Sequence, residues 1–122
     1  MKTIAITAES PDLDGRIDPR FGRAAGFVVV DPDTMAFDYV DNGASQIMSK
    51  GAGIQAAEIL ANTGAGVLLT GFVGPKAFQA LSAAGIAIGQ NLENLTVREA
   101  VQSFREGKIE IAEAPNSRSH QR

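Results

Sequence analysis

The chain has 122 residues, of which 44% are hydrophobic and 20% charged, and it contains no cysteine. This is the composition of an ordinary globular domain, and it excludes disulfides, thiolate-bound zinc and cysteine-held iron–sulfur clusters. A formal net charge of -3 argues against general nucleic-acid binding, which usually requires a basic face. No apolar run approaches the ~20 residues of a membrane span, and Lys2 begins a strand rather than a signal peptide. We therefore expect a cytoplasmic protein with neither nucleic acid nor a membrane as its partner.

Three strands are predicted in the first part of the chain. Residues 2–8 alternate apolar and polar side chains, as a half-buried strand does. Residues 27–30 form a continuous apolar run, which is typical of a strand covered on both faces. Residues 35–40 alternate again after a turn signal at 31–34. The second and third strands therefore form a hairpin, and the sheet contains an antiparallel member.

The second part of the chain alternates helices with strands. After a polar, flexible segment, residues 52–62 are expected to form a helix. The inward face of this helix is expected to carry Ile54, Ala57, Leu60 and Ala61. A buried strand over 67–70, a helix over 75–84 that starts with proline, and a short strand over 86–88 follow.

The last predicted helix begins with a capping box, in which Thr96 caps the helix and Glu99 lies three residues further on. The helix ends at Gly107, and beyond it Ile109 and Ile111 could add an edge strand. Its buried stripe is expected to consist of Val97, Ala100, Val101 and Phe104.

This order of elements predicts a three-layer α/β domain of the ribonuclease-H-like kind. Alternating strands and helices imply parallel strands joined by right-handed crossovers, and the hairpin makes the five-stranded sheet mixed. Helices should then cover both faces of the sheet. We expect a single cofactor-binding domain over residues 1–111. Residues 112–122 are expected to form a disordered C-terminal tail, because they hold no apolar residue beyond Ala114.

The connection over residues 10–25, between the first two strands, is too long for a hairpin turn. Loops of that length inside a small domain tend to be functional or disordered. Phe21 lies between Arg20 and Arg23 and argues for order, because an aromatic ring can anchor the loop while the guanidinium groups stay in water. Together with Arg16 these arginines form a local positive site on an acidic chain, which we interpret as a site for an anion.

Two glycine-rich segments precede helices and are expected near this connection, beyond the carboxyl ends of the parallel strands. Residues 51–53 and 74–76 contribute helix N-termini, whose N–H groups and dipoles favour an anion, and Lys50 and Lys76 add charge. Neither segment is a P-loop or a dinucleotide fingerprint, so the alternative that the glycines merely turn the chain stays open. The apolar pair at 47–48 either covers a ligand or partner or packs on the core.

An enzymatic function is the weakest interpretation. The carboxylates at Glu9, Asp12, Asp14 and Asp18 could suggest a two-metal nuclease, but the first strand is apolar where such an enzyme needs a carboxylate. Solvated loop carboxylates are the more ordinary reading. The lone histidine, His120, lies in the predicted tail, so no serine has a plausible base. We predict no catalytic and no metal-ligating residue.

Several blocks of the sequence resemble the dinitrogenase iron-molybdenum cofactor biosynthesis family. In order, they are Asp18 to Ala24, Asn42, Lys50 to Ile54, Thr70 to Ala77 and Ala84 to Ile86. Within that family, the chain is similar to a protein of sulfate-reducing bacteria in the strand at 26–31, in the segment at 41–46 and in its lack of cysteine. This similarity implies a non-covalently held sulfide cluster in which copper lies between two molybdenum centres. It also implies a scaffold or carrier role, in an assembly linked to cell division and partnered by ATPases of the Mrp type.

A cluster of that kind is a polyanion whose metals are already saturated by sulfide, so positive charge, helix-end N–H groups and apolar walls suffice to bind it. The expected cofactor-binding residues are Arg20, Phe21, Arg23, Gln46, Ile47, Met48, Ser49, Lys50, Gly51, Ala52, Gly53, Gly71, Phe72 and Gly74. The iron-molybdenum cofactor itself is the weaker candidate, because the family ligates it with cysteine or histidine and this chain offers only His120. The alternative function is a regulatory protein–protein interaction module, linked to cell division, that binds no metal.

Overall fold

The computed structural model describes residues 3–117, and its core is one sheet of five strands in the order β3-β2-β1-β4-β5. The strands are β1 (Ile4–Ala8), β2 (Gly26–Val30), β3 (Phe37–Asp41), β4 (Val67–Leu69) and β5 (Ala87–Gly89). Strand β2 is antiparallel to both β1 and β3, whereas β1, β4 and β5 are parallel to one another. The prediction of a mixed five-stranded sheet that contains a hairpin is confirmed.

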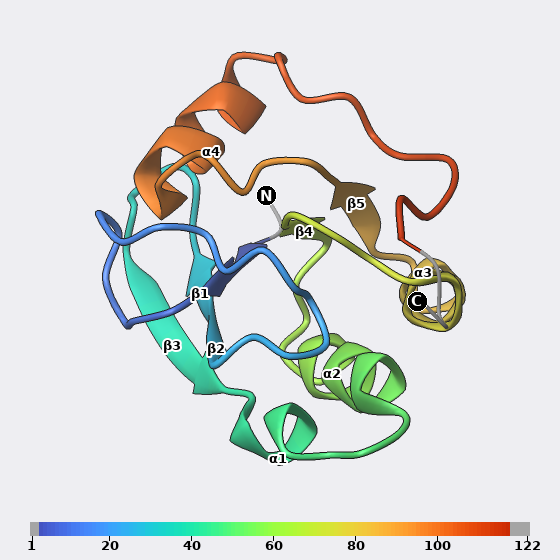
Figure 1. Cartoon of the computed structure of the whole chain (residues 1–122). Coiled ribbons are helices and arrows are strands. Elements are labelled where there is room, and N and C mark those ends of the chain that lie inside the picture. The colour runs from blue at the N-terminus through green and yellow to red at the C-terminus, as the bar shows by residue number, and fades with distance from the viewer. Residues whose placement is uncertain (1–2, 118–122) are drawn as a thin grey trace.

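Helices cover both faces of this sheet (Figure 1). Helices α2 (Ala52–Ala61) and α3 (Pro75–Ala83) pack on one face, and α4 (Val97–Arg105) packs on the other. A short helix, α1 (Gly43–Gln46), joins β3 to α2 where the sequence predicts a flexible segment. The three layers and the strand order are those of the ribonuclease-H-like fold that the sequence predicts.

Strand alternation separates the core into two halves. Ala5, Phe27 and Leu68 face the layer that contains α2 and α3, while Ile4 and Val28 face α4. Because successive side chains on a strand point to opposite faces, one apolar run fills both halves.

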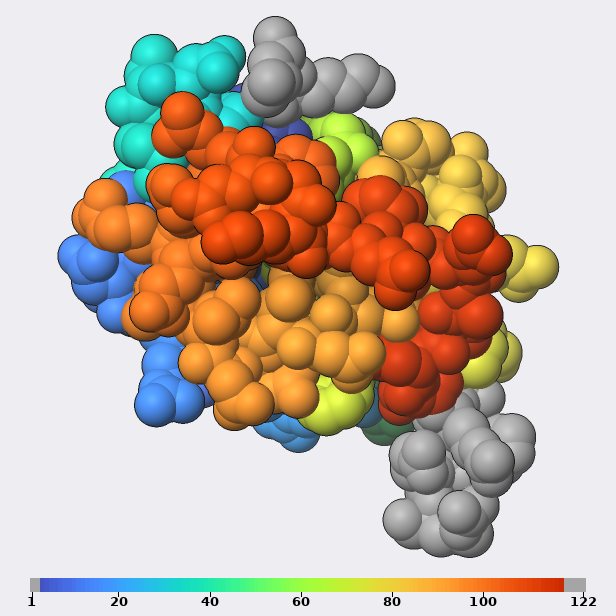
Figure 2. Space-filling view, turned by 90° about the horizontal axis from the view of Figure 1, so that it is seen from above, coloured from blue at the N-terminus to red at the C-terminus, as the bar shows by residue number. Residues whose placement is uncertain are grey.

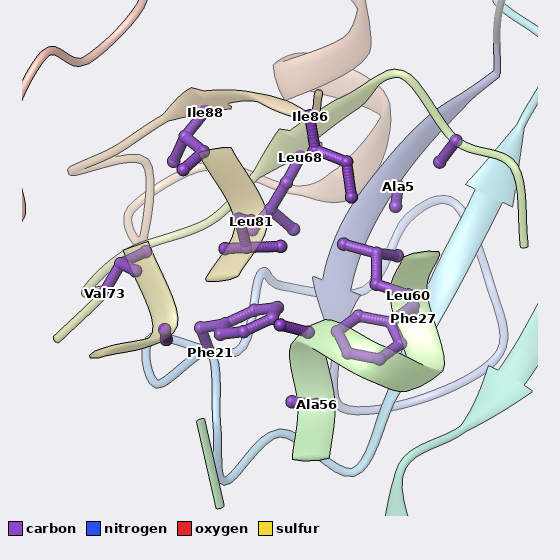
Figure 3. Close-up of a cluster of buried hydrophobic side chains, with 13 residues drawn as sticks. Ala5, Phe21, Phe27, Ala56, Leu60, Leu68, Val73, Leu81, Ile86 and Ile88 are labelled. Atoms are coloured by element: carbon purple, nitrogen blue, oxygen red, sulfur yellow. The ribbon is translucent and has the colours of Figure 1, made fainter. Parts of the chain in front are cut away.

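Phe21 comes from the connection between β1 and β2, yet it is only 1% exposed and belongs to the core beneath α2 and α3. Its ring centroid lies 5.7 Å from that of Phe27, and Figure 3 shows the two rings beside Leu60 of α2. Full burial of a phenylalanine contributes about 1.5–3 kcal/mol. The prediction that Phe21 anchors the arginine-containing connection is therefore confirmed.

The C-terminal part departs from the sequence-based expectation. No strand forms at Ile109 and Ile111 in the described chain, where Ile109 packs against Gly89 and Ile111 is 43% exposed. Residues 112–117, which the sequence assigns to a disordered tail, are hydrogen-bonded to the body. The Ala112 N–H donates to the Ile88 oxygen at 2.8 Å, and Asn116 makes further bonds described below. The rest of the predicted tail, with His120, lies outside the described residues.

None of the helices within residues 3–117 is both long enough and apolar enough to cross a bilayer. The predicted cytoplasmic location stays a prediction.

Candidate functional site

A cleft of about 630 Å³ lies where the connection between β1 and β2 meets the N-termini of α2 and α3. It is lined by Arg20, Phe21, Gly22, Arg23, Ser49, Lys50, Gly51, Ala52, Gly53, Ile54, Phe72, Gly74, Lys76, Ala77 and Ser117. We call it the cationic cleft, because four of these side chains are arginine or lysine and none is a carboxylate.

Backbone hydrogen bonds fix the β1–β2 connection at one side of the cleft. The Phe72 N–H donates to the Pro19 oxygen at 2.7 Å, and the Phe21 N–H donates to the Phe72 oxygen at 3.2 Å. The connection thereby pairs like a short parallel strand with the segment that follows β4. Gly71 allows this approach, since a Cβ there would lie 2.5 Å from the Pro19 oxygen.

Small residues bring the two helix N-termini together behind the connection. A Cβ at Gly22 would lie 2.9 Å from the backbone nitrogen of Gly53, and a Cβ at Gly53 would lie 2.9 Å from the Ala77 Cβ. The connection, α2 and α3 therefore touch almost backbone to backbone, which only glycine and alanine permit.

Both helices begin without a side-chain cap. The N-cap residue of α2 is Gly51, in the left-handed region at φ +74°, and that of α3 is Gly74. A glycine has no side-chain oxygen with which to accept from the first N–H groups of a helix, and Pro75 has no N–H of its own. The remaining first-turn donors and the positive ends of two helix dipoles thus meet at the cleft, where they favour an anion.

The exposed cations at the mouth, Arg20, Lys50 and Lys76, add whole charges to this field. Ion pairs within residues 3–117 join Asp14 to Arg98 and Glu106 to Lys108, and neither includes a residue of the cationic cleft. The cleft therefore carries positive charge that no carboxylate in the described part of the chain pairs with.

Arg23 lines the cleft and also holds a neighbouring segment in place, a contact that the sequence did not reveal. Its guanidinium donates to the carbonyl oxygens of Gln46, at 3.3 Å, and of Met48. The Gln46 side-chain amide donates back to the Arg23 oxygen at 3.3 Å. Arg23 thus holds the 46–48 segment against the β1–β2 connection, and part of its charge is compensated by carbonyl oxygens.

Most of the cofactor-binding residues predicted from the sequence line the cleft, and four do not. Gln46, Ile47 and Met48 lie beside the lining rather than in it, and Ile47 is 85% exposed. Gly71 is buried behind Phe72, against Pro19. The lining residues absent from the predicted set are Gly22, Ile54, Lys76, Ala77 and Ser117.

The prediction that Ile54 faces the core is wrong. Helix α2 buries Ala52, Ala56, Ala57 and Leu60, which leaves Ile54 on another face, 48% exposed and lining the cleft. Three alanines and Leu60, not Ile54, form the buried face of the helix. No sequence signal marks Ile54 as a cleft residue, because an apolar side chain in the first turn of a helix is equally expected on the buried face.

The side chains of the cleft do not suit direct metal ligation. Within residues 3–117 there is no group of three or more histidine, cysteine, aspartate or glutamate side chains that could hold a metal ion. Asp18, which lies within the connection, is 8% exposed and accepts from the Arg20 N–H at 3.2 Å, as a loop-forming aspartate does. Guanidinium, ammonium, N–H and apolar groups fit an anion whose own coordination is complete.

The fold and the cleft define a class of small three-layer α/β proteins with a cationic cleft at the N-termini of two helices. A family model described as dinitrogenase iron-molybdenum cofactor matches residues 2–107, and the chain belongs to this family. The family resemblance predicted from the sequence blocks is thereby confirmed.

Relatives of known structure share the fold over nearly their whole length. The chain is similar to the apo form of the orange protein from Desulfovibrio gigas, with 69% identity, coverage of 96% of this chain and 98% of that one, and a TM-score of 0.94. A NifB-like protein of Thermotoga is 31% identical, with 91% and 93% coverage and a TM-score of 0.77.

A relative found by sequence, an uncharacterized protein of Methanocaldococcus jannaschii, is 28% identical over 103 residues, which is 82% of this chain and 86% of the relative.

Proposed function

We propose that this protein is a non-enzymatic carrier that holds a metal–sulfide cluster non-covalently in the cationic cleft. The observation that carries the proposal is the convergence of two uncapped helix N-termini with four cationic side chains and no carboxylate in the lining. Membership of a family named for the iron-molybdenum cofactor, and high identity to the orange protein, support a metal cluster as the anion.

The chemistry of such a cluster matches the lining. Its metals are saturated by sulfide, so the cluster presents a polarisable anionic surface with no vacant metal position for a protein ligand to fill. Arg20, Lys50 and Lys76 supply charge, and the α2 and α3 N-termini supply N–H donors. Ile54 and Phe72 supply apolar walls that exclude water from the sulfides.

The finer assignment is a molybdenum–copper sulfide cluster, as the sequence resemblance implies. The iron-molybdenum cofactor is the weaker candidate, because none of the residues that line the cleft is cysteine or histidine. This assignment rests on the resemblance and on the chemical character of the lining.

Reconstitution tests the function. Tetrathiomolybdate and a copper salt are added to metal-free protein under anaerobic conditions, and unbound material is removed by gel filtration. We expect a visible chromophore that elutes with the protein at a fixed metal-to-protein ratio. The function is wrong if no protein-bound chromophore forms.

A charge-removal series locates the site. Replacement of Arg20, Lys50 and Lys76 together by alanine should abolish retention even at low salt, where charge attraction is strongest, while leaving folding intact because exposed charges contribute little to stability. Arg105→Ala, on the outer helix α4 at the opposite face of the sheet, is the matched control and should retain the cluster. Equal losses in both proteins would place the site elsewhere.

The second candidate, an interaction module without metal, is favoured by one feature, the 85% exposure of Ile47 beside the cleft. Single exposed hydrophobic side chains are common on protein surfaces, so this candidate has weaker support than the carrier. Binding of a Mrp-type ATPase that survives thorough metal stripping and is lost in Ile47→Asp would support this candidate. Binding that requires the chromophore would support the carrier.

A further inference from the structure

Asn116 connects the C-terminal segment to the wall of the cationic cleft. Its side-chain nitrogen donates to the Gly71 oxygen and to the Asn91 Oδ1 atom, both at 2.9 Å. Its side-chain oxygen accepts from the Val73 N–H, also at 2.9 Å. One amide group thus satisfies three polar groups of the two loops that follow β4 and β5.

These bonds complete a pattern on the segment 71–73. The N–H and oxygen of Phe72 bond to the β1–β2 connection on one side, at Pro19 and Phe21. The oxygen of Gly71 and the N–H of Val73 point to the other side, as successive residues of an extended segment do, and there they meet Asn116. The Gly71 oxygen also accepts from the Asn91 N–H at 2.9 Å, so Asn116 and the loop after β5 fix the segment together from this side, and Asn116 alone bonds to the Val73 N–H.

What Asn116 fixes is part of the cleft. Phe72 and Gly74 line it, Gly74 is the N-cap of α3, and Ser117 next to Asn116 is itself a lining residue. The direction in which the α3 N-terminus points into the cleft depends on this short segment. A shift of the segment would misdirect its N–H donors.

The segment 112–117, which we call the C-terminal strap, is attached by polar bonds with little apolar burial. It begins beside β5, where Ala112 bonds to Ile88, and runs over the surface toward α3 (Figures 1 and 2). The Gln90 side-chain amide donates to the Ala114 oxygen at 3.2 Å, while Ala114 and Pro115 are exposed. Elements held by exposed hydrogen bonds and few apolar contacts open at low free-energy cost.

We propose that Asn116 is a positioning residue of the cationic cleft, and that the C-terminal strap it anchors controls how firmly a bound anion is retained. The inference rests on the proposed carrier function. With the strap docked, the α3 N-terminus and Phe72 are held in their binding positions. With it detached, the cleft loses the Ser117 wall and the 71–73 segment loosens. Because the docked form binds the anion better, a bound anion in turn stabilises docking.

The test uses the full chain loaded with tetrathiomolybdate and copper, in the wild type and in Asn116→Ala. We expect Asn116→Ala to weaken retention by about five- to twentyfold, the range that loss of one or two hydrogen bonds gives. The dependence of retention on salt should keep its slope, because no cation is removed, whereas Arg20→Ala should reduce that slope. Asn94→Ala, which changes an exposed asparagine outside the cleft lining, is the matched control and should behave like the wild type.

Amide hydrogen exchange provides a readout that does not depend on the chromophore. In Asn116→Ala the Val73 N–H should exchange faster, while the Phe72 N–H, which bonds to Pro19, should keep its protection. In the wild type, loading should slow the exchange of Val73. A general loss of protection in both amides would mean that Asn116 serves stability alone and would overturn the inference.

A second variant keeps the test decisive if Asn116→Ala folds poorly. Gln90→Ala removes only the exposed bond to Ala114 and should weaken retention by about twofold. If the wild type forms no chromophore, the carrier function fails. If the wild type forms the chromophore, and both Asn116→Ala and Gln90→Ala retain it as well as the wild type does, the carrier function stands and the strap inference is wrong.

Discussion

The N-terminus of α4 and those of α2 and α3 meet the same physical requirement in opposite ways. At α4, the Thr96 Oγ1 atom accepts from the Glu99 N–H at 3.1 Å, and the Glu99 carboxylate accepts from the Thr96 N–H at 2.9 Å. The helix end is closed by its own side chains. At α2 and α3 the cap residues are glycines, which provide no side-chain acceptor.

The capped and the uncapped helix N-termini lie on opposite faces of the sheet. The closed end belongs to α4, which packs on one face, whereas the two open ends lie together on the other side, among cations and exposed apolar side chains. First-turn N–H groups need a partner, so an open end must take water or a ligand. The α4 N-terminus is thus capped within the protein, whereas the α2 and α3 N-termini keep free donors, as the proposed cluster-binding function requires.

The largest expected effect on stability concerns Phe21, which anchors the β1–β2 connection at the cationic cleft. Phe21→Ala should lower the free energy of unfolding by about 3–5 kcal/mol, because Phe21 is fully buried. Phe104→Ala, on α4, should cost less, because Phe104 is only partly buried. Urea unfolding of the two variants measures the difference, and an equal or larger loss for Phe104→Ala would contradict this assignment of the core.

Removal of the closed cap should affect stability alone. Thr96→Ala should cost about 1 kcal/mol, as loss of an N-cap side chain commonly does. Retention of the cluster should be unchanged, because Thr96 lies outside the cleft. The comparison between the two kinds of helix end would weaken if Thr96→Ala reduced retention as much as it reduced stability.

The smallest effect concerns the ion pair that ties α4 to the β1–β2 connection. The Arg98 guanidinium, 2.8 Å from Asp14, holds the pKa of that carboxyl below its usual range through hydrogen bonding and charge. Since the folded pKa is the lower one, the pair contributes stability above about pH 4, and this is lost as the pH falls through the folded pKa. Both groups are exposed, so the contribution is small.

Urea midpoints of the wild type and Asp14→Asn between pH 2 and 7 test this sign. The two proteins should differ slightly near neutral pH and converge in acid. A difference that grows as the pH falls would mean that Asp14 has no depressed pKa.

Local patterns predicted the fold well because they depend on nearby residues. The strand alternation, the Thr96–Glu99 capping box and the glycines before α2 and α3 all act within a few positions. The anchoring role of Phe21 was likewise visible from its place between two arginines.

Features that depend on distant contacts were not predictable in the same way. Asn116 bonds to residues 25 and 45 positions away, and no local pattern marks a polar residue in a tail-like sequence as a contact. The clamp from Arg23 to the 46–48 segment is of the same kind. Ile54 was misplaced because helical periodicity alone could not tell which face of α2 the sheet would cover.

Closing an open helix end tests the account most directly. Gly74 has the extended conformation that a cap requires and room for a Cβ, so Gly74→Ser can accept from the first-turn N–H groups of α3. Gly74→Ala fills the same space without an oxygen and is the matched control. We expect Gly74→Ser to be more stable than Gly74→Ala yet to retain the molybdenum–copper chromophore less well. Retention in Gly74→Ser equal to or better than that in Gly74→Ala would contradict the claim that the open helix ends bind the cluster.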